Sequence, residues 1–479
     1  MDIIIDQEVA YLAFTFVAAP DLARCTCVSS RWKEATTSTV LWGRLLRNEF
    51  RLTDIVGTDG SPVAGAREAY AHWHSWRASL DCAESVMIDA ALRIRMGRSW
   101  EALRAFFARN LPAVASSLRP AVTPAHWSGL SCALRSRPSG PPLGTTLPGM
   151  VALRLLLEQC DGQEAPPPGR PWTGCIGGYG AYDHVVCVGL HSSDSIRLWT
   201  KRLAQGVEHL DDELGPFLVP IAQNYFSVDK IFFLHLVTGD VYYLNSSNRA
   251  SPFALAHPPV TVPGSGLVLW LETLAARVRD GTYVASEIVT GNPATLGLCL
   301  FPQRPIGRPP GERGGGSFTI AVTRGIEVRS SCQFVPEQGQ WTYSIHIRIL
   351  LEGGPGALSV ADRGFDTCQL LDRHWHIVPA DGGDGEHVRG RGVVGQFPLL
   401  RDGGHRADVQ NGHDIPDALV EGAWAAGAFV YQSCSGPTAP GAIFGGEFTF
   451  IPGTLRNPTG KPFDVEVAPF TLSIPDFIF

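Results

Sequence analysis

Apolar residues recur at helical spacing in the first fifty residues of the chain. Leu22, Cys25, Val28 and Trp32 are separated by three, three and four positions, which lines one face of a helix. Asp21 precedes them as a candidate N-cap. The same segment also carries the apolar residues Leu41, Trp42, Leu45 and Leu46. A unit of about fifty residues buries so much apolar surface poorly by itself, so we expect it to lie against a partner.

The middle of the chain mixes helical and strand patterns. The apolar pattern over residues 84–117 predicts two amphipathic helices, the second starting near Ser99. Two apolar runs, KIFFLHL and DVYYLN, flank Thr238-Gly239 and predict a β-hairpin. Residues 267–281 predict a further amphipathic helix, with Gly281 placed to cap it. This mixture indicates an α+β domain.

Beyond residues 303–317, which have the Gly/Pro-rich composition of a flexible linker, the apolar period changes to two. The apolar members of this pattern are Trp341, Tyr343, Ile345, Ile347 and Ile349, with Thr342, Ser344, His346 and Arg348 between them, and Phe463, Val465 and Val467 repeat it. Several such strands separated by Gly/Pro turns predict an antiparallel β-sandwich.

The bulk composition narrows the choice of partners. The 479 residues are 44% hydrophobic and 18% charged, enough for several cores and typical of roughly three domains. A net charge of −7, without any Lys/Arg run, predicts neither a nucleic-acid partner nor attraction to anionic lipid. Residues 3–19 are apolar, but Asp6, Gln7 and Glu8 interrupt them, so a partly buried helix fits better than a signal or membrane segment.

The cysteines indicate a compartment. There are 11 of them, and their spacing fits neither a disulfide framework nor a zinc site. We therefore expect reduced thiols in a protein of the cytoplasm or the nucleus.

The stretch HVRGRGVVGQFPLL places Gly390, Gly392 and Gly395 in the spacing G-x-G-x-x-G. A dinucleotide-binding turn needs a strand before these glycines and a helix after them. Pro398 stands where that helix would form its hydrogen bonds, so we interpret the glycines as a bent strand or loop of a β-domain. An anion held by the backbone N–H groups of the three glycines is the alternative.

Other motifs give no catalytic site. Gly460-Lys461 lacks the glycine spacing of a phosphate loop, and Pro462 follows where Ser or Thr belongs. His374 and His376 share one face of a predicted strand, but the sequence nearby offers no Cys, Asp or Glu at ligand spacing. We therefore predict no metal site, no cofactor and no catalytic residue.

The N-terminal segment resembles an F-box. The resemblance rests on Ala19-Pro20-Asp21-Leu22, on Val28 and Trp32 at the spacing V-x-x-x-W, and on Leu41-Trp42. It implies binding to the Skp adaptor of a cullin-RING ubiquitin ligase. The Leu-Pro that usually opens the motif is missing, with Ile5-Asp6 near its place. The residues expected to face the adaptor are Val9, Leu12, Pro20, Leu22, Val28, Trp32, Leu41 and Trp42.

Residues 320–479 resemble an ApaG domain, which implies a fibronectin-III-like sandwich. The matching segments are Arg373-His374-Trp375, the glycine stretch from Val388 to Pro398, Phe429-x-Tyr431-x-Ser433, Gly446-x-Phe448-x-Phe450 and Phe463-x-Val465. In that family the G-x-G-V-V-G is a hallmark, with a suggested pyrophosphate role. The chain departs from the pattern by an insertion at 403–425.

Residues 98–282 resemble the SUKH-type domain that lies between F-box and ApaG domains in plant-type F-box proteins. The resemblance is carried in order by Ser99-Trp100-Glu101, Leu118-Arg119-Pro120, Cys160-Asp161-Gly162-Gln163, Gly177-Gly178-Tyr179 and Tyr182-Asp183. The expected fold is thus multidomain α+β: a helical F-box at 1–50, an α+β domain at 98–282, a linker at 303–317 and an all-β sandwich at 320–479.

These resemblances imply a substrate receptor of a Skp–cullin–F-box (SCF) ligase, without catalysis of its own and with an unknown protein substrate. Two alternatives stay open. One is an F-box scaffold that supports no ubiquitination, and the other is a nucleotide or pyrophosphate sensor, or a pyrophosphate hydrolase, that works through the ApaG glycine loop.

Overall fold

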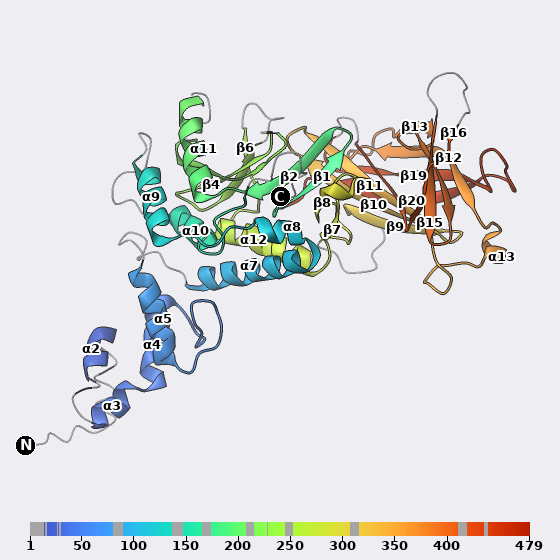
Figure 1. Ribbon diagram of the computed structural model, residues 1–479. Helices are drawn as coiled ribbons and strands as arrows, with labels where there is room; N and C mark the ends of the chain where they lie inside the picture. The colour runs from blue at the N-terminus through green and yellow to red at the C-terminus, as the bar shows by residue number, and fades with distance from the viewer. Residues whose placement is uncertain are drawn as a thin grey trace, which may run out of the picture.

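The computed structural model describes residues 14, 17–25, 27, 30–79, 90–136, 147–164, 174–206, 215–227, 229–244, 252–306, 316–410, 419–434 and 439–479. A small helical unit comes first, a central unit with one large sheet follows, and a β-sandwich ends the chain (Figure 1). Residues 307–315 of the expected linker lie outside the described residues. Within the described ranges, no helix is long and apolar enough to cross a membrane.

The N-terminal unit is a group of short helices around its own apolar core. Its described helices of more than one residue are α2 (Ala19–Cys25), α3 (Ser30–Thr36), α4 (Thr39–Phe50) and α5 (Ala66–Ala78). The Ser38 hydroxyl caps α4 by accepting from the N–H of Val40. Tyr70 and Trp73 of α5 pack on Phe50 of α4, with ring centroids 5.6 and 6.0 Å apart. The core of this unit therefore extends beyond the expected bound at residue 50.

In the central unit, helices pack on a mixed sheet of eight strands in the order β6-β5-β4-β3-β2-β1-β8-β7. All neighbouring strands of this sheet are antiparallel except β1 and β8, which are parallel. In this unit α7 and α12 lie side by side, as Figure 1 shows. The helices are α7 (Ala90–Asn110), α8 (Pro112–Ser117), α9 (Pro124–Arg135), α10 (Pro148–Leu157), α11 (Ser193–Gly206) and α12 (Ser265–Arg279), with 3₁₀ turns at Gly215–Phe217 and Pro293–Thr295. The strands are β1 (Gly177–Ala181), β2 (His184–Leu190), β3 (Leu218–Asn224), β4 (Ile231–His235), β5 (Val241–Leu244), β6 (Phe253–Leu255), β7 (Val284–Glu287) and β8 (Leu296–Cys299).

Two of the local predictions for this unit are confirmed. Strands β4 and β5 pair as an antiparallel hairpin, with Gly239 at a φ of 81° in its turn. Helix α12 covers the predicted helical segment, and Gly281 follows it at a φ of 76°. The sheet also takes in β7 and β8, so the unit extends past residue 282.

The predicted helix start near Ser99 is wrong. Helix α7 runs without a break through this position from Ala90 to Asn110. The Ser99 hydroxyl donates to the carbonyl of Arg95, 2.7 Å away and one turn earlier, so its side chain bonds within the helix instead of capping a new one.

The C-terminal unit is the predicted antiparallel sandwich of two sheets. One sheet has the order β18-β11-β10-β9, and the other β16-β15-β14-β12-β19-β20, with β13 paired to β12 and β17 to β15. A short helix, α13 (Val360–Arg363), connects the two. The strands are β9 (Phe318–Thr323), β10 (Ile326–Val335), β11 (Gln340–Ile349), β12 (Cys368–Val378), β13 (Glu386–Arg391), β14 (Gln396–Arg401), β15 (Gly404–Gln410), β16 (Leu419–Val420), β17 (Trp424–Ala426), β18 (Phe429–Cys434), β19 (Ala442–Pro452) and β20 (Phe463–Leu472).

Strand β11 shows how closely the sandwich meets the central unit. Its apolar residues face the sandwich core as the alternation predicts, but Thr342 and Ser344 between them are each only 2% exposed. Strand β1 of the central sheet lies against β11 and β18, so the nominally outer face is covered as well. The Thr342 hydroxyl donates to the Ser433 carbonyl at 2.9 Å, which satisfies this buried polar group.

The last residues of the chain return to the central unit. The indole N–H of Trp270 in α12 donates to the Ile478 carbonyl at 2.7 Å, and the Ile478 N–H donates to Ala256. Phe479 stacks on Trp270 with ring centroids 5.5 Å apart. Together with β1 and β11, this contact joins the two units into one continuous apolar core.

Candidate functional site

Most of the described residues expected to face an adaptor lie inside the N-terminal unit. Leu22, Leu41 and Trp42 are buried in its core, and the Trp42 indole N–H donates to the Thr36 carbonyl at 2.7 Å. Trp32 is half-buried and meets the Phe14 ring edge-on, with centroids 5.3 Å apart. The expected roles of Val9, Leu12 and Val28 fall outside the described residues. The buried side chains thus hold the helices together in the isolated chain.

A different set of residues forms the surface of this unit. Pro20 at the start of α2 is exposed, and Val40 in the first turn of α4 is 68% exposed. Val40 directly precedes the buried pair Leu41-Trp42, so it projects from the opposite side of the helix. The sequence pattern missed this residue because a single apolar position outside the helical stripe carries no periodic signal.

Glu158 holds the N-terminal unit to the central one. Its carboxylate forms ion pairs with Arg93 and with Arg154, the latter at 2.9 Å, and accepts from the Trp76 indole N–H at 3.3 Å. The Arg93 guanidinium also lies over the Trp76 ring, 4.5 Å from its centroid. Since Trp76 belongs to α5, Arg93 to α7 and Arg154 to α10, these contacts connect helices of both units.

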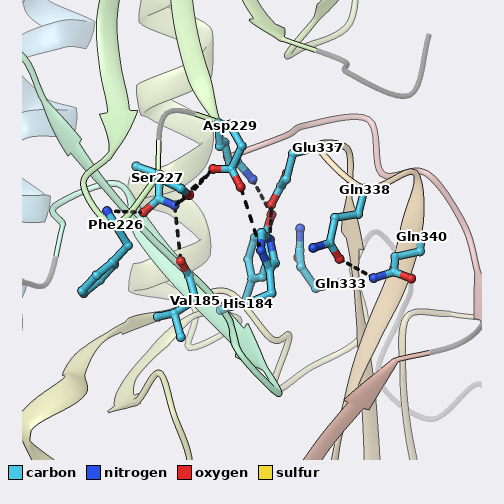
Figure 2. A network of polar contacts seen from close by, with 12 residues as sticks. His184, Val185, Phe226, Ser227, Asp229, Gln333, Glu337, Gln338 and Gln340 are labelled. Atoms are coloured by element: carbon cyan, nitrogen blue, oxygen red, sulfur yellow. Dashed lines mark hydrogen bonds and ion pairs between the residues drawn. The ribbon is translucent and has the colours of Figure 1, made fainter.

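A buried polar network connects the central unit to the sandwich. Lys230, just before β4, is 1% exposed and donates from Nζ to the Tyr179 hydroxyl at 2.9 Å. That hydroxyl donates to Glu337 Oε1 at 2.6 Å, and Glu337 lies in the turn between β10 and β11. His184 Nε2 lies 2.9 Å from the same oxygen, while its Nδ1 lies 3.9 Å from Asp229. Figure 2 shows His184 between the two carboxylates.

Burial and the neighbouring charges shift the pKa values of three groups in this network. Burial lowers the pKa of Lys230, against the opposing effect of Glu337. Burial would raise the pKa of Glu337, but the Lys230 charge and the hydrogen bonds from His184 and Tyr179 leave it below its ordinary value. Burial and the Glu337 charge raise the pKa of Tyr179 well above its usual range. The site therefore joins a buried lysine to a buried carboxylate through a phenol that keeps its proton at neutral pH.

Beside the network lies a pocket of about 200 Å³, lined by residues of both units. Tyr182 belongs to its wall, is 62% exposed, and has its hydroxyl 2.8 Å from Ser433 Oγ of the sandwich. The pocket is also lined by Asp183, His184 and Cys434.

The three glycines of the G-x-G-x-x-G stretch lie in a strand and the turn after it within the β-sandwich, as predicted. Gly390 belongs to β13, and Gly392 and Gly395 have φ values of 58° and 75° in the turn that leads into β14. Val393 and Gln396 exchange backbone hydrogen bonds of 2.9 and 2.8 Å across this turn. No helix follows, because the next element is strand β14, so the geometry of a dinucleotide-binding turn is absent.

The N–H groups of this turn bond within the fold. The N–H of Gly392 donates to the Leu371 carbonyl at 3.0 Å, and those of Val393 and Gln396 donate to each other's carbonyls. A Cβ on Gly392 would come within 2.5 Å of the Gln396 carbonyl oxygen, and the φ of Gly392 is 58°, so close approach and backbone conformation both require glycine there. These three donors therefore do not point at a shared anion, as a backbone nest would require.

Three histidines gather on the outer face of the second sheet. His374 and His376 of β12 meet His387 of β13, and one ring nitrogen from each lies within 4.8 Å of the others. Glu447 of β19 stands opposite His374 and lies 2.6 Å from its Nδ1. His387 and Glu447 are distant from the two β12 histidines in the sequence. They reach them only through the pairing of β12 with β13 and with β19, so the sequence alone showed neither.

Known proteins match this chain in its parts and as a whole. A family model described as the ApaG domain matches residues 331–407, and one described as F-box-like matches residues 7–48. The F-box protein SKIP16 of Arabidopsis thaliana is 28% identical over 491 aligned residues, which cover 98% of this chain and 98% of that protein. The protein ApaG of Anaeromyxobacter dehalogenans is 31% identical over 161 residues, 33% of this chain and 97% of its own length. The protein ApaG of a Bradyrhizobium strain is also 31% identical over 161 residues, 92% of its length.

Proposed function

The chain belongs to the ApaG family through its C-terminal domain and joins that domain to an F-box-like domain, and from this we propose that it is the substrate-recognition subunit of an SCF ubiquitin ligase. The observation that carries the proposal is the F-box-like match together with a relative, named as an F-box protein, that aligns from end to end. The bound ligase would supply the ubiquitin chemistry. The receptor would contribute proximity and no catalysis of its own.

The exposed side of the N-terminal unit would bind the Skp-type adaptor. Val40 and Pro20 are apolar and open to solvent, whereas Leu22, Leu41 and Trp42 already pack on one another. The buried residues would therefore act on adaptor binding indirectly, by keeping the helices in place. Val40 would act directly, by burying its side chain on the partner.

The remainder of the chain would present the substrate in a fixed orientation. The Glu158 contacts hold the F-box-like unit to the central unit, and the Lys230–Glu337 network holds the central unit to the sandwich. Such a rigid path favours ubiquitin transfer by keeping the substrate at a defined distance from the ligase. We assign substrate binding to the SUKH-like and ApaG region, with the pocket beside Tyr182 as its candidate surface.

We infer the compartment from the thiols. All the cysteines that the structure describes are free, and Cys27 and Cys132 are exposed. Thiols of this kind persist in a reducing environment, which favours the cytoplasm or the nucleus.

Adaptor co-purification tests the first half of the proposal. The full chain is produced together with a Skp-type adaptor, and a charged residue is placed at the exposed position by Val40→Glu. We expect adaptor affinity to fall by roughly tenfold or more, because a charge would have to be buried in the interface. Val262→Glu is the matched control, because Val262 is 47% exposed on the central unit, away from the proposed interface. This variant should bind the adaptor with wild-type affinity.

Leu22→Ala distinguishes an effect on the folding of the N-terminal unit from the loss of a direct contact with the adaptor. Leu22 is 0% exposed, so its truncation should destabilise the N-terminal unit by roughly 2–5 kcal/mol, visible as faster proteolysis of this unit before any adaptor is added. Adaptor binding that is unchanged in both Val40→Glu and Leu22→Ala would contradict the F-box assignment.

The main alternative is an F-box scaffold that supports no ubiquitination. Reconstituted ligase assays with proteins that co-purify with the wild-type chain distinguish the two functions. Transfer of ubiquitin to such a protein, lost with Val40→Glu and kept with Val262→Glu, supports the receptor. Adaptor binding without transfer to any co-purifying protein would favour the scaffold.

A further inference from the structure

The histidine cluster on the outer face of the ApaG domain has the composition of a metal site. We propose that His374, His376 and His387 bind one divalent transition-metal ion of the zinc class through their imidazole nitrogens, with Glu447 as the carboxylate that orients His374. This site is independent of the proposed adaptor and substrate contacts.

The strands fix the ligands in place. His376 of β12 pairs directly with His387 of β13, and His374 pairs directly with Glu447 of β19. Directly opposed residues on neighbouring strands have Cβ atoms roughly 5 Å apart, so their side chains meet on the same face. Gly445 stands opposite His376 and adds no side chain there. Ligands held by two paired strands, with Glu447 on a third, are better preorganised than ligands on a loop.

The distances suit a shared ion. One ring nitrogen from each histidine lies within 4.8 Å of the other two, and the distance from His374 Nε2 to His387 Nδ1 is 3.0 Å. In a tetrahedral site with zinc–nitrogen bonds of about 2.0–2.1 Å, the ligand nitrogens are separated by roughly 3.3 Å. His376 is half-buried and His387 is exposed, so both rings have room to turn toward an ion, while His374 is buried and fixed.

Glu447 determines which nitrogen of His374 is available. Its Oε1 lies 2.6 Å from His374 Nδ1, a distance at which a carboxylate accepts the ring N–H. Nε2 then carries the lone pair and faces His387. A carboxylate behind a ligating histidine is the usual second partner in zinc sites, where it fixes the tautomer and the ring orientation.

The rings of the three histidines lie close to one another. The ring centroids of the three histidines lie 4.2, 5.1 and 4.7 Å apart. A bound cation would be held by one lone pair from each imidazole, with the Glu447 carboxylate beside them. Three imidazoles would leave a fourth position on the ion for water or for a side chain of a bound protein.

Zinc binding by the full chain tests the proposal. Untagged protein, stripped with a chelator, is titrated with zinc against a competing chelating dye. We expect one equivalent to bind to the wild-type chain. We expect affinity to fall by more than roughly 100-fold in His376→Ala/His387→Ala, and by about 10–100-fold in Glu447→Gln. His126→Ala, at an exposed histidine outside the cluster, should leave binding unchanged.

Three further measurements make the result decisive. Cys25→Ser/Cys27→Ser removes two thiols of the N-terminal unit that could also attract zinc, and it should leave the zinc equivalent of the histidine cluster in place. Near-ultraviolet circular dichroism of each variant confirms that the sandwich is folded. Cobalt substitution should give a spectrum of nitrogen and oxygen ligands without thiolate bands. Equal zinc uptake by the wild type and the folded His376→Ala/His387→Ala variant would overturn the proposal, as would loss of the equivalent in the cysteine variant alone.

Discussion

The buried Lys230 offers the sharpest test of how the central unit and the sandwich are joined. Lys230→Met keeps most of the apolar stem but removes the ammonium group that lies 2.9 Å from the Tyr179 hydroxyl. Glu337, whose side chain is only 1% exposed, then keeps its charge without its neighbouring cation. Removal of one partner from a buried pair costs roughly 3–5 kcal/mol. We expect a value near 3 kcal/mol, because His184 still lies 2.9 Å from the carboxylate.

Hydrogen exchange of the β3 and β4 amides in the full chain measures this cost, because it reports the free energy of opening of one region in a multidomain protein. The double variant Lys230→Met/Glu337→Gln should be more stable than the sum of the single effects implies, by more than about 1 kcal/mol. Arg197→Met is the control, since the Arg197–Asp194 pair is 63% and 64% exposed and contributes less than about 1 kcal/mol. If Lys230→Met is as mild as this control, the network does not join the domains.

Three other predictions concern acid stability, the chain end and the glycine turn. Burial lowers the pKa of His191 from 6.5 to about 4, so between these two pH values the unfolded chain takes up a proton that the folded chain does not. The free energy of unfolding should therefore fall by up to about 3 kcal/mol as the pH falls from 6.5 to 4. His191→Gln should flatten the dependence of the melting temperature on pH over this range. Phe479→Ala should cost roughly 3–5 kcal/mol and lower the melting temperature, whereas Phe226→Ala, at a residue 50% exposed, should not. Pyrophosphate and nucleoside polyphosphates should leave the melting curve unchanged, because the Gly392 N–H already donates to Leu371; a rise that depends on ligand concentration would revive the anion-binding alternative.

Where the residue pattern is local and repeated, the sequence predicted the structure. The alternation from Trp341 to Ile349 marked strand β11, and the helical spacing near Leu271 marked α12. Pro398 was enough to exclude a dinucleotide-binding helix after the three glycines, since proline cannot donate the hydrogen bond that a helix needs. Such features depend on residues a few positions apart, so the pattern contains the information.

Other features required the tertiary structure, because they join residues far apart in the chain. Thr342 is polar and alternates with core residues, yet it is buried because strand β1 covers its face of the sheet. Val40 and Leu22 are both apolar, but the packing of the helices exposes the first and buries the second.

The histidine cluster shows the same division most clearly. The sequence itself placed His374 and His376 on one face of a strand, because side chains alternate with a period of two. It did not bring His387 and Glu447 to them, because the register of β12 with β13 and β19 is a property of the folded sheet. The sequence by itself therefore determined those helices and strands whose residue pattern is local, while the pairing of distant strands and helices decided which side chains meet, since those contacts form only when the whole chain packs.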